Sequence, residues 1–120
     1  MVNIKQYDEH EDFLHHKEEF MLFYDTILKH TTLKNANVLE VGAGESKHTG
    51  FIANAAKYVL GTDIIDYRDK LGKNYKCDII KYYNKHGCGL NPGDFDYIRA
   101  DAQRLAFKIV KFDIIFCINV

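Results

Sequence analysis

The sequence predicts an α/β fold, in which an N-terminal helix precedes a doubly wound, mostly parallel sheet. Three observations support this prediction. Short apolar runs alternate with segments of helical periodicity along the 120 residues. The first apolar run stops at the turn Gly42-Ala43-Gly44, and the next run ends on an acid, Asp63. Two strands joined by a helix, with a glycine turn after the first, are typical of one half of an open parallel sheet.

The segment from residue 8 to residue 30 predicts an amphipathic helix, and Thr31-Thr32 ends its pattern. Apolar side chains recur there at helical spacing, and further apolar side chains widen the stripe: Phe13, Phe20, Tyr24 and Ile27, with Leu14, Met21 and Leu28 beside them.

Four apolar segments then predict strands, at residues 38–41, 58–63, 95–101 and 112–120. Residues 47–57 predict a helix capped by Ser46, with Phe51, Ile52 and Ala55 facing inward. A second helix is expected around residues 77–85, followed by loop and turn at 86–93, where glycines and Pro92 gather. We expect helices to cover both faces of the resulting sheet.

The composition indicates a single globular domain. Hydrophobic residues make up 47% of the chain, and the net charge is −1, which provides no general attraction to nucleic acid or membrane. No apolar run is long enough to span a bilayer, and residues 1–8 lack the apolar stretch of a secretory signal. Three cysteines without paired spacing fit reduced thiols, so we expect a cytoplasmic protein without a membrane partner.

The glycine turn predicts a binding site for a nucleoside. Gly42 and Gly44 allow a sharp turn after the strand and leave backbone N–H groups with no side chain in front of them. Asp63 ends the second predicted strand, and its distance in sequence from Gly44 is the one at which nucleoside-binding sheets place an acid beside the glycine turn. A short carboxylate there can accept hydrogen bonds from both ribose hydroxyls.

The charges around this turn select among nucleoside ligands. A dinucleotide site has a third glycine where this chain has Lys47, and Glu45 places a negative charge where a pyrophosphate would lie. Glu40, at the tip of the strand, suits a ligand with a cationic amino group. S-adenosylmethionine carries such an amino group, a ribose and a sulfonium, but no phosphate. An NAD-type dinucleotide-binding oxidoreductase fragment remains the enzymatic alternative.

Four segments together resemble the motifs of class I S-adenosylmethionine-dependent methyltransferases, of the methyltransferase type 11-like group. Residues 38–44 resemble the first motif, apolar-apolar-acid-x-Gly-x-Gly, and residues 61–64 resemble the second, which supplies the ribose acid. Residues 99–107 resemble the third motif and residues 112–120 the fourth, which enters the central strand. The resemblance implies a Rossmann-like cofactor-binding domain over residues 37–120, with residues 1–36 as an N-terminal helical cap.

The resemblance also implies roles for individual residues. Glu40 would hold the methionine amino group, mostly through water, and Asp63 the ribose hydroxyls. Asp101 would meet the adenine amino group, with Ala102 as its backbone companion. The remaining cofactor-binding positions that the motifs imply are Gly42, Ala43, Gly44, Ile64 and Asn119. The reaction implied is methyl transfer by direct displacement, to an acceptor that the sequence does not identify.

The family's sheet has seven strands, whereas this sequence predicts four. We therefore expect a fragment of a longer coding sequence, or a sheet that another chain completes, and no catalytic residue can be named. A non-catalytic module that needs a partner chain is the other alternative. Tyrosines among the lysines of residues 67–85 leave RNA stacking open, although a helix core and rim is the commoner explanation.

The histidines and cysteines predict no metal site. His10, His15, His16 and His30 are expected on the polar, solvated side of the first helix, and no His-Glu-x-x-His pattern occurs. His48 is expected either to touch the cofactor or to lie on the surface at a helix start. Cys77 and Cys88 lack zinc-ligand spacing, and Cys117 is expected to be a small core residue.

Overall fold

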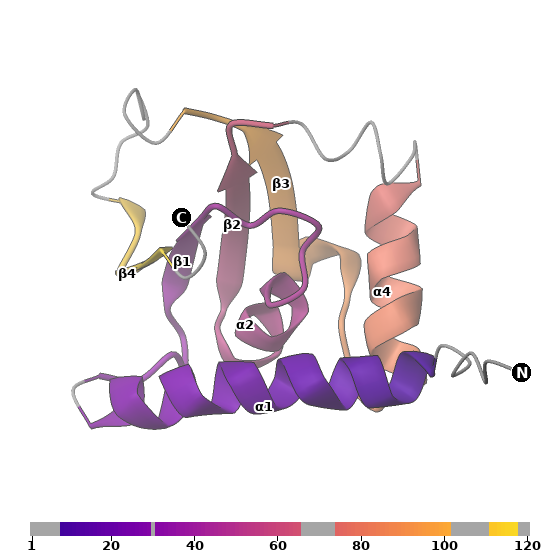
Figure 1. The fold of residues 1–120 in the computed structure, drawn as a ribbon. Helices are drawn as coiled ribbons and strands as arrows, with labels where there is room; N and C mark the ends of the chain where they lie inside the picture. The colour runs from indigo at the N-terminus through magenta and orange to yellow at the C-terminus, as the bar shows by residue number, and fades with distance from the viewer. Residues whose placement is uncertain (1–7, 30, 66–73, 102–110, 118–120) are drawn as a thin grey trace, which may run out of the picture.

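The structure, a computed structural model, describes residues 8–29, 31–65, 74–101 and 111–117. Its elements follow the predicted order (Figure 1): α1 (Glu9–Leu28), β1 (Asn37–Val41), α2 (Thr49–Ala55), β2 (Tyr58–Asp63), α4 (Tyr75–Lys85), a short 3₁₀ helix η1 (Pro92–Asp94), β3 (Phe95–Arg99) and β4 (Ile114–Cys117). Every predicted helix and strand is therefore confirmed as to type, and β2 has its predicted bounds.

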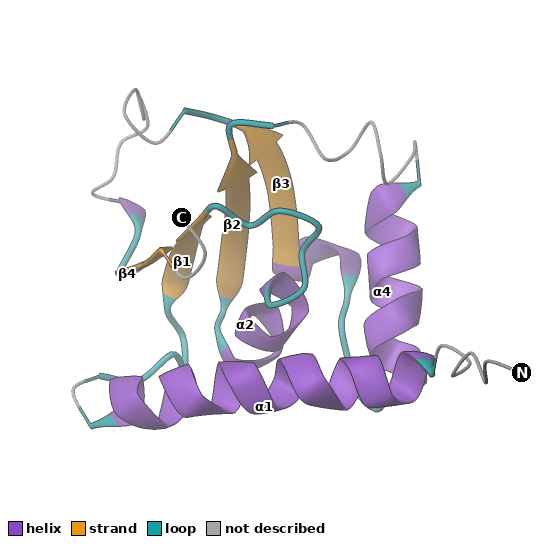
Figure 2. Cartoon of the chain, viewed as in Figure 1, coloured by secondary structure: helices purple, strands orange, loops and turns teal. Residues whose placement is uncertain are grey.

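The four strands form one sheet in the order β3-β2-β1-β4, and all neighbouring pairs are parallel (Figure 2). The chain moves outward from β1 through β2 to β3 and then returns to the other side of β1 to form β4. The strand order therefore reverses between β1 and β4. In open α/β sheets, ligands bind at such a reversal, outside the carboxyl ends of the strands.

One face of the sheet carries the hydrophobic core. In the row of residues paired across the sheet, Val38, Val59 and Phe95 are all fully buried. Side chains from the three described α-helices join this row in a single buried cluster, among them Phe13 of α1, Phe51 of α2 and Tyr83 of α4. The aromatic rings of these three lie against one another, with centroids 5.1–6.1 Å apart.

On the opposite face of the sheet, no helix packs within the described residues. The prediction that helices cover both faces is therefore confirmed for one face only. Ile115, which points to that opposite face, is 46% exposed. Cys117, on the same face at the end of β4, is also exposed, so its expected place in the core is wrong. The reason is that β4 is the outermost strand on its side of the described sheet.

The buried stripe of α1 is narrower than predicted. Phe13 and Phe20 are buried as expected, but Leu14 and Met21 are about two-fifths exposed (41% and 39%) and do not widen the stripe. His16 lies between the two phenylalanines on the helix face that packs against the rest of the protein, and it is half-buried. Within the described ranges, no helix combines the length and the apolar character needed to cross a bilayer.

Candidate functional site

The carboxyl ends of three strands are joined at one edge of the sheet by backbone hydrogen bonds around Asp63. The Ala43 N–H donates to the Thr62 carbonyl at 2.9 Å, and the Ala100 N–H donates to the Asp63 carbonyl at 2.8 Å. The Asp63 carboxylate accepts from the Gly44 N–H at 2.9 Å and from the Ile65 N–H at 3.1 Å. This edge, made of residues 42–48, 63–65 and 100–101, is called the carboxyl edge below.

The glycine turn, residues 42–48, has the backbone that its sequence predicts. Gly42 and Gly44 adopt positive φ angles of 74° and 58°, which side chains other than glycine rarely tolerate. A Cβ placed on Gly44 would meet no atom within 4 Å, so the backbone there faces open space. Ala43, between them, is buried, and its side chain packs close to the backbone of Gly61 on β2. A Cβ on Gly61 would lie 3.3 Å from the Ala43 Cβ. Ala43 therefore offers the site its backbone and not its side chain.

The turn continues into α2 without the predicted side-chain cap. Ser46 has a positive φ of 65°, and its buried hydroxyl has no hydrogen-bond partner among the described residues. The cap position of α2 is His48, which makes no side-chain capping bond either. The prediction that Ser46 caps this helix is therefore wrong, because the left-handed backbone at Ser46 belongs to the turn and the helix begins at Thr49.

Glu40 lies beneath the turn and not on the surface of the site. Its side chain is 3% exposed, and the Thr49 hydroxyl donates a 2.5 Å hydrogen bond to its Oε1. Burial raises the pKa of Glu40 to about 7, against the opposing effect of the Thr49 hydrogen bond. A carboxyl group with this pKa changes its charge near neutral pH, in direct contact with the first residue of α2.

Tyr83 of α4 supports the turn from below. Its hydroxyl lies 2.8 Å from the carbonyl oxygens of both Ser46 and Lys47, so its single proton is shared between them. Burial raises the pKa of Tyr83 well above its ordinary value, which keeps the hydroxyl protonated as a donor. A pocket of about 170 Å³ opens beside this contact, between the turn and α4. Its lining includes Glu45, Lys47, Tyr75, Asp78 and Tyr82.

Apolar side chains stand next to the acid at the end of β2. Ile64 and Ile65 are each 57% exposed, and the Ile64 carbonyl accepts a 2.9 Å hydrogen bond from Arg99 Nε. Asp101 follows β3 at the same edge and is half-buried. The predicted positions Ala102 and Asn119 lie outside the described residues. The structure thus brings together Gly42, Gly44, Asp63 and Ile64 at the open edge, with Glu40 behind them.

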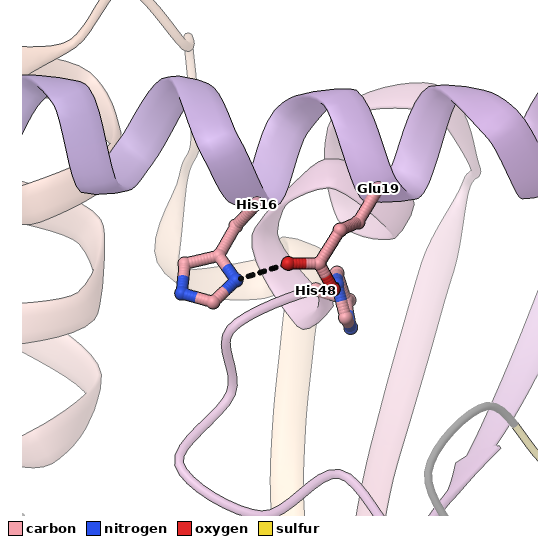
Figure 3. Close-up of side chains that lie close together, drawn as sticks. All are labelled: His16, Glu19 and His48. Carbon is pink, nitrogen blue, oxygen red and sulfur yellow. Dashed lines mark ion pairs between the residues drawn. The ribbon is translucent and has the colours of Figure 1, made fainter.

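Two histidines lie where the sequence did not place them. His48 is 4% exposed, which excludes the surface position, one of the two alternatives expected for it, and His16 faces it from α1 and not from the solvated side. Both face Glu19, as Figure 3 shows. Burial lowers the pKa of His48 below its ordinary value, and the Glu19 carboxylate opposes that shift. The residues at the site that sequence reasoning missed are Glu19, Thr49 and Tyr83. Of these three, only Tyr83 could have been identified from the sequence, because its helical spacing from Ile79 places both residues on one face of the predicted helix.

Comparisons with known proteins agree with this architecture. A family model described as a methyltransferase domain matches residues 39–120. Among solved structures, the chain is similar to phosphoethanolamine N-methyltransferase 1 from Haemonchus contortus, solved in complex with phosphoethanolamine and S-adenosylhomocysteine. The two are 20% identical with a TM-score of 0.52, over 92% of this chain and 26% of that one. This chain thus spans about a quarter of that protein's length. No curated protein matches the sequence.

Proposed function

This chain belongs to the methyltransferase domain family, whose members use S-adenosylmethionine, and we propose that it binds this cofactor at the carboxyl edge of its sheet. The observation that carries the proposal is the contact between the Gly44 amide and the Asp63 carboxylate, at the point where Gly44 faces open space. A nucleoside can approach the backbone there and meet an acid at the same time.

The described residues fit the parts of this cofactor. Each Asp63 carboxylate oxygen accepts one backbone N–H and keeps a further lone pair, so both oxygens can still accept from ribose hydroxyls. The exposed Ile64 and Ile65 offer an apolar surface next to that acid, which suits the face of an adenine ring. Glu45 places a negative charge at the turn, where the pyrophosphate of a dinucleotide would lie, and this supports S-adenosylmethionine over a dinucleotide.

Glu40 acts in this proposal from behind the turn. Because its carboxyl group is 3% exposed, it reaches a bound amino group through water or through the turn and not by open contact. A cationic group at the turn would favour the ionised form of Glu40, whose pKa is otherwise raised to about 7. Asp101, at the end of β3, is proposed to receive the adenine amino group.

The chemistry itself comes from the cofactor, whose sulfonium supplies a methyl group to a nucleophile of the acceptor by direct displacement. The contribution of this chain is to hold the nucleoside in one orientation against the sheet edge. Such alignment of two bound partners can lower the barrier by up to roughly 7–11 kcal/mol. We propose that the methyl acceptor is held by further polypeptide, from a longer chain or from a partner chain, that packs beside β4. This strand is the outermost one of the described sheet on that side.

Calorimetric titration with S-adenosylhomocysteine and with NAD tests the proposal. We expect the chain to bind S-adenosylhomocysteine and not NAD. Gly44→Ala should weaken binding by at least about tenfold, or roughly 1.4 kcal/mol, because a methyl group then fills the open space at the turn. Gly87→Ala is the matched control, since Gly87 also has a positive φ and open space but lies after α4, away from the carboxyl edge. Binding of NAD alone, or equal effects of the two substitutions, would contradict the proposal.

A further inference from the structure

A cluster of three metal-ligand side chains lies between α1 and the end of the glycine turn. His16 and Glu19 lie one turn apart on α1 and project from the same face of that helix, and His48 meets them from the residue before α2 (Figure 3). One ligand atom from each residue lies within 4.8 Å of the other two. We refer to these three residues as the histidine cluster.

The ring nitrogens that face the centre of the cluster have no conventional partner. His16 Nδ1 and His48 Nε2 are both buried, and neither makes a hydrogen bond with a described residue. Each instead lies near one oxygen of the same carboxylate, His16 Nδ1 at 3.4 Å from Glu19 Oε1 and His48 Nε2 at 3.7 Å from Glu19 Oε2. A buried imidazole nitrogen that lacks a hydrogen bond is unfavourable, so these two nitrogens together indicate a ligand between them.

The surroundings of the cluster suit a cation. The other ring nitrogen of His16, Nε2, lies 3.5 Å from Asp12 Oδ1, the position in which a metal-bound histidine directs its second N–H toward a carboxylate. The rings of His16 and His48 are nearly perpendicular, at 83° with centroids 5.9 Å apart, so their nitrogens approach the centre from different directions. Two imidazoles and one carboxylate form a donor set that first-row transition-metal ions such as zinc accept.

We propose that His16, Glu19 and His48 bind one divalent transition-metal ion, with zinc as its probe. Ligand atoms on one tetrahedral zinc lie roughly 3.3 Å apart, so the most distant pair of the three, within 4.8 Å, needs to close by up to about 1.5 Å to bind it. Three protein ligands leave one coordination position for water.

A bound ion would join α1 to the glycine turn. His48 ends the turn that begins at Gly42, whereas His16 and Glu19 belong to the helix that packs over it. The metal therefore serves in this proposal as a clamp that fixes α1 against the carboxyl edge, and it takes no part in methyl transfer. The site does not depend on the proposed cofactor, since none of its ligands is among the residues assigned to S-adenosylmethionine.

Zinc titration of the metal-free chain, followed by calorimetry and by thermal unfolding, tests the proposal. We expect one equivalent of zinc to bind and the midpoint of unfolding to rise. His16→Ala and His48→Gln should each weaken zinc binding by about tenfold or more, because each removes one ligand. The matched control is the single substitution His10→Ala. It removes another exposed histidine of α1 that contacts none of the three ligands, and it should bind zinc as the unmodified chain does.

X-ray absorption at the zinc edge of the loaded control variant provides a second measurement, which needs no ligand variant to fold. We expect two imidazole nitrogens and oxygen donors in the first shell. Failure to bind zinc, binding that survives the loss of His16 and His48 together, or a zinc spectrum without two imidazoles would each overturn the proposal.

Discussion

The Gly44 amide donates a 2.9 Å hydrogen bond to the Asp63 carboxylate, and this bond joins the turn after β1 to the end of β2. The same carboxylate also receives the Ile65 N–H, so one acid orders the backbone on both sides of the proposed nucleoside site. A single side chain thus has two functions, to hold the turn and to present acceptor oxygens to a ligand.

Replacement of Asp63 by alanine should affect both functions. Loss of the two backbone hydrogen bonds should lower the free energy of unfolding by about 1–3 kcal/mol. Binding of S-adenosylhomocysteine should fall by more than about tenfold. Asp63→Asn, which keeps one carbonyl oxygen for the Gly44 N–H, should recover most of the stability and little of the binding. Urea unfolding and calorimetry measure the two effects, and a variant that binds as tightly as the unmodified chain would refute the ribose role.

Replacement of Glu40 by glutamine should change how stability depends on pH. The folded protein raises the pKa of Glu40 from its ordinary value of 4.5 to about 7, so the native state holds this proton more tightly than the unfolded chain does. Its contribution to stability is complete below about pH 4.5 and is lost as the pH rises through 7. The loss amounts to about 3 kcal/mol, since one pKa unit corresponds to about 1.4 kcal/mol. Glu40→Gln should lack this loss and be the more stable protein at pH 8.

Chemical unfolding at several pH values between 4 and 8 measures this effect. Glu18→Gln, at an exposed position of α1, is the control and should follow the unmodified chain throughout. Parallel pH profiles for Glu40→Gln and the unmodified chain would show that Glu40 does not titrate near neutrality.

Replacement of Gly50 by alanine should destabilise the protein strongly. A Cβ on Gly50 would lie 2.3–2.5 Å from three ring atoms of Tyr83, and that ring is 1% exposed and packed against Phe51. The ring cannot move aside without opening the core, so we expect a loss of about 1–3 kcal/mol or more. Gly93→Ala, where nothing lies within 4 Å, should change the free energy of unfolding by less than about 0.5 kcal/mol. Thermal unfolding of the two variants compares them, and equal midpoints would be the contrary result.

Removal of the Tyr83 hydroxyl should loosen the glycine turn without disturbing the core. Tyr83→Phe keeps the buried ring but leaves the Ser46 and Lys47 carbonyls without their donor, which should cost about 1–2 kcal/mol of stability. Hydrogen exchange at the amides of residues 44–48 should become faster in this variant. Tyr75→Phe, on the first turn of α4 with its ring against Tyr97, is the control and should leave that exchange unchanged. Unaltered exchange in Tyr83→Phe would exclude the supporting role.

Much of the fold follows from local patterns. The bounds of β2 are predictable because an apolar run lies between Lys57 and an acid, so both ends are marked in the sequence. The turn at Gly42 and Gly44 and its closeness to Asp63 are predictable for a similar reason, since two glycines and a strand-ending acid at this spacing imply a parallel pair. The cofactor roles of Glu40, Asp63 and Asp101 stay predictions.

The remaining features of the site depend on tertiary contacts that no local pattern contains. The hydrogen bond between Thr49 and Glu40 and the support of the turn by Tyr83 join separate elements. The polar residue type of His16 predicts a place on the polar side of α1, although its position falls between Phe13 and Phe20 on the buried stripe. The burial of His48 likewise follows from how α1 lies over the turn, which the sequence alone does not determine.

The pairing of β1 with both β2 and β4 also bears on the order in which the chain folds. Asn37 exchanges two hydrogen bonds with Asp113, at 2.8 Å each, across 76 positions of sequence, whereas Gly44 and Asp63 are separated by only 19. A fourfold longer loop costs about 1.2 kcal/mol more in closure entropy. Contacts between β1 and β2 should therefore form first, and β4 should add later along the folding pathway. The glycine turn would then be assembled while the side of β1 that later receives β4 is still unpaired.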